Sequence, residues 1–178
     1  PRVGAAGLAW EVPLSYVRVS TSLMRRKPSA ESDGTAPLAA PRRVFVALDG
    51  NPVHMVPATT PGTYVPFVAD EYMELREVGD GWRLDTLGGV QYTFRPVTSL
   101  GNGAYADPNL WLLTQIRHVA SPDRVELEYD IQQVECGAAG SLGPEVNLSR
   151  VRHTFDANNV PLFEVSLHYG GYQPYDTQ

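Results

Sequence analysis

The sequence predicts an all-β fold of consecutive antiparallel hairpins, which form a large curved sheet or a sandwich with little or no helix. Many short segments alternate apolar and polar residues with a period of two, as half-buried strands do. Turn-forming residues separate these segments, and the 16 glycines and 15 prolines suit frequent turns. No segment has the three-to-four-residue apolar spacing of an amphipathic helix.

The stretch 81–94 is the clearest hairpin in the chain. Two alternating runs, 82–86 and 90–94, flank Gly88-Gly89. These glycines tolerate positive φ at little cost, which suits a two-residue primed turn or a short bulged loop. One face of the hairpin is so apolar that it needs a partner sheet. We therefore expect the rest of the chain to supply further hairpins.

The N-terminal region predicts two strands and a long connection. Alternation over 7–14 indicates an opening strand, which Pro13 ends or confines to a sheet edge because proline cannot donate to a ladder. Alternation resumes over 16–20. Residues 25–41 are polar and Pro-rich with few large apolar groups, and they predict a long flexible loop.

The next region predicts a second hairpin followed by two strands. Residues 43–48 are β-branched and aromatic, and 53–56 return after the turn-forming sequence of 49–52. A short extended piece over 63–68 and an alternating strand over 72–78 then lead into the hairpin described above.

The C-terminal region combines strands with Gly-rich connections. We expect connecting loops over 97–108 and 134–145. The apolar run 111–119 predicts a strand, with a short helix as the alternative. Three more strands are expected over 124–131, 148–155 and 162–169.

Composition limits the classes of partner. Hydrophobic residues make up 43% of the 178 residues, which suits one globular domain over 1–178. The net charge of −6 and a single basic run, Arg25-Arg26-Lys27, argue against nucleic acid. No apolar run approaches the roughly 18 residues that span a membrane. Because the chain opens on Pro1 in a strand-like segment, we expect it to be a piece of a longer protein.

The residue types that usually carry chemistry are scattered. Cys136 is the only cysteine and has no neighbouring histidine, so it predicts neither a disulfide nor a nucleophile. Glu126 and Glu128 share one strand face at roughly 6–7 Å, an acid/base spacing, but a solvated polar face is the preferred interpretation. The four histidines lack metal-ligand spacing and are interpreted as cross-strand polar residues: His54, His118, His153 and His168.

Three other groups of residues resemble parts of binding sites. Asx residues that could suggest Ca²⁺ loops fit turns better, and they are Asp49, Asn51, Asp156, Asn158 and Asn159. Trp10, Trp82 and Trp111 could form a sugar-stacking platform, but core packing is the preferred interpretation. Gly101-Asn102-Gly103 lacks the spacing of a phosphate cradle. The sequence thus predicts no catalytic, cofactor-binding or metal site.

Five short motifs, in order along nearly the whole chain, resemble those of SpvB-type and Rhs (YD-repeat) toxin proteins. They are Gly7-Leu8-Ala9-Trp10 with Pro13-Leu14 and Arg18; Val44-Phe45-Val46 through Val56; Trp82 through Phe94; Trp111 through Ile116 with Val125, Leu127 and Tyr129; and Leu148 through Tyr169. Three departures keep turn chemistry: Ala9 stands for a Gly, Gly88-Gly89 for Asp-Gly, and Ser121-Pro122-Asp123 for a Gly-Asn turn.

The resemblance implies a non-enzymatic role without cofactors. In the B component of insecticidal toxin complexes, such a region contributes to a β-sheet shell that encloses a toxic polypeptide. It implies a secreted or cell-surface protein whose partners are the remainder of its own chain and other toxin-complex subunits. A carbohydrate-binding β-sandwich is the alternative, and it requires an exposed cluster of Trp and Tyr.

Overall fold

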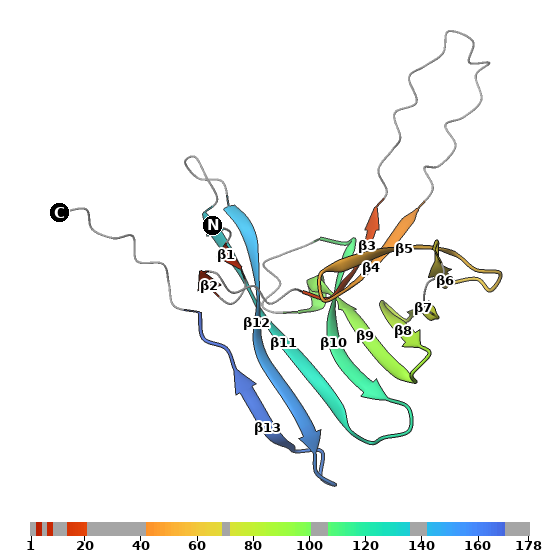
Figure 1. Cartoon of the computed structure of the whole chain (residues 1–178). Coiled ribbons are helices and arrows are strands. Elements are labelled where there is room, and N and C mark those ends of the chain that lie inside the picture. The colour runs from red at the N-terminus through yellow and green to blue at the C-terminus, as the bar shows by residue number, and fades with distance from the viewer. Residues whose placement is uncertain are drawn as a thin grey trace.

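The computed structural model describes residues 3–4, 7–8, 14–20, 42–68, 72–100, 107–135 and 142–169 (Figure 1). Thirteen strands and one 3₁₀ turn, η1 (Val97–Ser99), make up its regular structure. The strands are β1 (Val3–Gly4), β2 (Gly7–Leu8), β3 (Tyr16–Ser20), β4 (Arg43–Leu48), β5 (Asn51–Pro57), β6 (Thr63–Pro66), β7 (Met73–Val78), β8 (Gly81–Thr86), β9 (Val90–Pro96), β10 (Leu110–His118), β11 (Arg124–Glu135), β12 (Leu142–Phe155) and β13 (Pro161–Ser166).

The eight strands from β3 to β10 close into an antiparallel barrel. Each strand pairs with the next one along the chain, and β10 closes the circle by pairing with β3 through Leu110–Leu112. The opposite edge of β10 pairs with β9, where a register shift between Leu113 and Gln115 marks a bulge. Such bulges bend a strand and increase its twist, which helps a sheet to close.

A three-stranded extension, β11–β13, leaves the barrel through β10 (Figure 1). One edge of β10 is divided between two partners. Its first part pairs with β3, and its second part, Gln115–Arg117, pairs with Arg124–Glu126 of β11. The long β11–β12 hairpin and then β13 continue the sheet outward from that point.

The interior of the barrel is filled with apolar side chains. The cluster draws at least one residue from each of the eight strands: Val17, Val19, Val44, Val46, Met55, Tyr64, Leu75, Trp82, Leu84, Phe94 and Leu113. Trp82 is 2% exposed and packs edge-on against Tyr64 and Trp111 at ring-centroid distances of 5.4 and 5.8 Å. This interior is therefore a packed core, as expected for a small barrel.

A second apolar cluster joins the extension to the barrel. Its buried members are Val97, Leu112, Tyr129, Ile131 and Leu148. The Tyr129 hydroxyl donates a hydrogen bond of 2.6 Å to the Leu113 carbonyl oxygen of β10. Burial raises the pKa of the Tyr129 hydroxyl well above its ordinary value. The extension is thus attached by apolar packing and by one buried hydrogen bond as well as by strand pairing.

We predict that Tyr129→Phe lowers the free energy of unfolding by about 1–3 kcal/mol, because it leaves a buried carbonyl without its donor. Folding raises the pKa of the Tyr129 hydroxyl. The stabilisation that this hydroxyl gives the folded state is therefore complete below pH 10, and it is lost at higher pH because Tyr129 ionises in the unfolded chain first. Urea titrations between about pH 8 and pH 11 should therefore show the difference from wild type shrinking with pH. Tyr72→Phe, at an exposed hydroxyl, is the control.

The predicted all-β fold of consecutive antiparallel hairpins is confirmed. The run 111–119 forms a strand, β10, and not the alternative helix. The predicted loop over 134–145 is wrong at both ends, because β11 continues to Glu135 and β12 begins at Leu142. The ladder persists there through pairs such as Gln133 with Pro144, since a proline is tolerated where no ladder donor is required.

The predicted connection 97–108 begins with the 3₁₀ turn η1 and is described at 97–100 and 107–108. The predicted flexible loop 25–41 lies outside the described residues. In the part of the chain that the structure describes, no helix has the length and apolar character needed to cross a membrane.

Candidate functional site

The four histidines lie on different segments of the chain: His54 in β5, His118 in β10, His153 in β12 and His168 after the end of β13. His54 stacks on Phe45 at 5.1 Å and tilts against Phe67 at 5.7 Å. His118 is exposed, and its Nε2 lies 2.9 Å from the Gly88 carbonyl oxygen. Among the described residues, no group of three His, Cys, Asp or Glu side chains converges on a point that could hold a metal ion.

Glu126 and Glu128 belong to an ion-pair network across β11 and β12. Arg124 donates from Nε to Glu126 at 2.6 Å, and Arg152 bonds to Glu128 across the strand pair. Arg150 lies 3.4 Å from Glu128. Both carboxylates therefore accept charge-assisted hydrogen bonds from arginine. A polar hollow of about 320 Å³ lies beside them, bordered by Thr93, Arg95, Leu100, Thr114, Gln115 and Leu127.

The Asx residues shape turns. The Asp156 carboxylate accepts hydrogen bonds from the backbone NH groups of Asn158 and Val160 at 2.9 and 2.8 Å, which closes the β12–β13 turn. Asp49 and Asn159 adopt positive φ, a conformation that Asx residues tolerate better than most. The Asp156 side chain thus acts as a local backbone partner, whereas the Asn159 side chain accepts a hydrogen bond from Arg124.

The tryptophans that the structure describes do not form an exposed platform. Trp82 lies in the barrel core, and the Trp111 indole NH donates a hydrogen bond of 2.8 Å to the Asp80 carbonyl oxygen. Trp10, Cys136, Arg25-Arg26-Lys27 and Gly101-Asn102-Gly103 lie outside the described residues. The sequence-predicted candidates are thus not brought together at one place.

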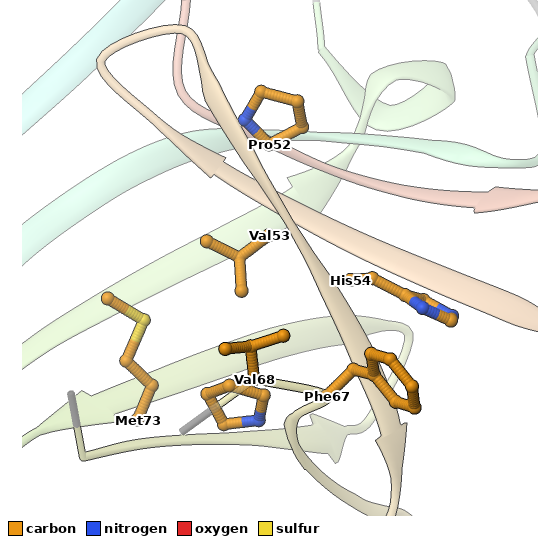
Figure 2. A pocket seen from close by; sticks show the side chains of 7 residues that line it. Pro52, Val53, His54, Phe67, Val68 and Met73 are labelled. Carbon is orange, nitrogen blue, oxygen red and sulfur yellow. The ribbon is translucent and has the colours of Figure 1, made fainter. Parts of the chain in front are cut away.

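An apolar groove of about 340 Å³ lies on the barrel wall where β6 ends (Figure 2). β5 pairs with β6 through Met55–Pro57, and the Phe67 backbone NH donates a hydrogen bond of 2.8 Å to the His54 carbonyl oxygen just beyond that ladder. The lining residues are Pro52, Val53, His54, Pro66, Phe67, Val68 and Met73. Phe67 and Val68 are 68% and 63% exposed, which gives this groove an apolar rim open to solvent.

The outer edge of β13 is the second exposed surface. Among the described strands, β13 pairs only with β12. Leu162, Phe163 and Val165 are each more than half exposed, although they belong to a strand. Phe163 and Val165 lie on one face of the sheet, where His153 of β12 stacks on the Phe163 ring at 5.1 Å. An open, apolar edge of this kind is a template for pairing with another strand.

Sequence reasoning did not single out this edge as a functional surface. Alternation over 162–169 predicted a strand with one apolar face, and such a face is usually buried. Only the strand order places this segment at the end of the sheet, where that face has no cover among the described residues. Comparison of the chain with protein-family models, curated proteins and solved structures finds no match.

Proposed function

We propose that this chain is a non-catalytic structural module of a secreted or cell-surface bacterial protein of the SpvB/Rhs toxin type. In this proposal its sheet forms part of a shell or scaffold that encloses or presents a toxic effector. Its partners are the remainder of its own parent chain and, in a complex, other toxin subunits.

The observation that carries the proposal is the open-ended sheet. The barrel supplies a packed core, and β11–β13 carry the sheet away from it to an exposed apolar edge. A barrel by itself removes all strand edges, so an extension that restores one exposes the chain to unwanted association. The presence of such an edge is explained if further strands of the parent protein pair with it.

The order of the five sequence motifs also supports the proposal. The hairpin from Trp82 to Phe94 forms β8–β9 in the barrel wall, and the stretch Leu148–Tyr169 contains the last hairpin of the extension. Shells of the Rhs type are built from such hairpins added edge to edge. A module that combines a stable core with an open edge suits that construction.

The reading frame of the parent gene tests this proposal. We expect YD-type hairpin repeats and a variable C-terminal toxin segment downstream of the codon for Gln178. A start codon just before Pro1 together with a stop codon after Gln178 would contradict the shell.

A glycan-binding screen of the free module provides the second test. The carbohydrate-binding alternative requires an exposed Trp/Tyr cluster, whereas Trp82 is buried and the Trp111 NH is bound to Asp80. We expect no saturable binding and no change of melting temperature with any sugar. Saturable binding that stabilises the module would favour the alternative.

A further inference from the structure

One face of the extension carries charges that alternate in sign from strand to strand. Glu126 and Glu128 of β11 lie opposite Arg152 and Arg150 of β12. Arg152 in turn lies opposite Glu164 of β13. The row therefore reads negative, positive, negative from the barrel side to the open edge.

The network is connected through its arginines. Arg150 and Arg152 each place Nε at 3.3 Å from a different oxygen of Glu164. The same two arginines also reach Glu128, and Arg152 lies 4.0 Å from Glu126. Directly opposite charges on neighbouring strands are stabilising, and like charges are destabilising. In the pairing of β12 with β13, opposite charges thus lie opposite each other, and we expect the same of a strand added to β13.

Glu164 retains capacity for another partner. Its side chain is 42% exposed even with both arginines in place. An ionised carboxylate offers about four lone-pair sites. Oε1 of Glu164 faces Arg150 and also accepts a hydrogen bond of 3.3 Å from the Ser166 hydroxyl, while Oε2 faces Arg152, so one site is left for a further donor. β13 has no described neighbour on its outer side, from which a further donor would approach.

A second copy of this chain does not fit the edge. β13 has the sequence Pro-Leu-Phe-Glu-Val-Ser and contains no Lys or Arg. Two copies paired about a twofold axis centred on Glu164 would place the two carboxylates opposite each other. Other registers that keep the faces aligned place Glu164 opposite Leu162 or Ser166, which are uncharged.

The opposite face of the edge sets a second requirement. Phe163 and Val165 are 57% and 51% exposed there, next to His153 and Val151 of β12. Because side chains alternate across a strand, a partner strand must present apolar residues on this face and a cation on the other. All pairings in the sheet are antiparallel, so we expect the same orientation for the added strand.

We infer that the open edge of β13 receives an antiparallel strand that places an Arg or Lys opposite Glu164 and apolar side chains beside Phe163 and Val165. This inference rests on the proposed function, in which further strands extend the sheet, and it states the chemistry of the first of them. The charged pair selects the partner and its register, while main-chain hydrogen bonds and apolar contact provide most of the affinity.

Two strand peptides that differ at one residue test the inference. Both peptides carry alternating Val and Thr. They differ at the central residue, which lies opposite Glu164 in the expected register and is Arg in one peptide and Glu in the other. Titration at low salt, followed by fluorescence anisotropy, should show the Arg peptide binding about fivefold more tightly than the Glu peptide. Amide NMR shifts should change in β13 and β12 and not in the distant strands β5–β7.

The variant Glu164→Gln should remove this preference, so that the two peptides bind alike. Glu164→Arg should reverse it, and circular dichroism of both variants checks that the fold is retained. Equal binding of both peptides to the wild-type chain would overturn the inferred charge complementarity while leaving an edge that accepts strands. The inference would be overturned altogether if neither peptide bound, or if size-exclusion chromatography showed that the chain dimerises through β13. The reading-frame test decides the proposed function separately.

Discussion

Trp82→Ala is expected to lower the free energy of unfolding by about 3–5 kcal/mol, the usual cost of deleting a large aromatic side chain from a core. Trp82 is 2% exposed and lies between Tyr64 and Trp111, and the Arg42 guanidinium is 5.3 Å from the centre of its ring. Its removal leaves a cavity that the closed wall of strands cannot readily collapse to fill. Domains are stable by about 5–15 kcal/mol, so the variant should be partly or wholly unfolded at moderate temperature.

Urea denaturation followed by far-UV circular dichroism measures this loss. Leu87→Ala is the matched control, because Leu87 lies in the turn of the same hairpin and is 83% exposed. We expect the control to remain within about 0.5 kcal/mol of wild type. A Trp82→Ala variant as stable as Leu87→Ala would show that the barrel core does not depend on this ring.

The strands of the barrel could be predicted from the sequence because their alternation is local. Leu84 and Phe94 lie in runs with a period of two, and both are fully buried in the structure. The register of β8 with β9 follows from the turn at Gly88-Gly89, since turn geometry fixes which residues lie opposite each other. Short-range pattern and turn chemistry are sufficient for a hairpin.

Closure of the barrel could not be predicted in the same way. It depends on β10 pairing with β3 through residues such as Leu110 and Arg18, which lie far apart in the sequence. It also depends on one edge of β10 pairing with both β3 and β11, and the pattern of residues within one segment does not indicate which strands will pair with it. Prediction from local pattern therefore gave the hairpins but left a curved sheet and a sandwich both open.

The charge network illustrates the same limit at the candidate site. Glu126 and Glu128 were recognisable as a polar strand face, but their arginine partners lie on another strand and were not expected. Arg150 and Arg152 meet those carboxylates only because a register shift between Glu128 and Tyr129 of β11 sets the pairing of the long β11–β12 hairpin. The extent of this hairpin was itself underestimated, since Gly143 and Pro144 are typical of loops.

Gly81→Ala is expected to destabilise the protein by about 1–3 kcal/mol or more, because overpacking at a rigid position forces the backbone to move. A Cβ atom at Gly81 would lie 2.4 Å from the Phe94 carbonyl oxygen, which is a backbone atom of the neighbouring strand. The collision can be relieved only by separating β8 from β9 near the pair formed by Trp82 and Phe94. That movement displaces two of the largest side chains in the core.

Two other glycines of the same hairpin region separate this steric effect from a general cost of alanine. Gly88 has open space around its Cβ position and no positive φ, so Gly88→Ala should leave stability within about 0.5 kcal/mol. Gly79 has open space but a φ of +62°, so Gly79→Ala should cost only the conformational strain, about 1 kcal/mol. Denaturation midpoints that rank Gly81→Ala below Gly79→Ala, and Gly79→Ala below Gly88→Ala, would establish that the close approach of β8 to β9 requires a glycine. If Gly81→Ala matched Gly88→Ala, the two strands would have to be more loosely paired than their register indicates.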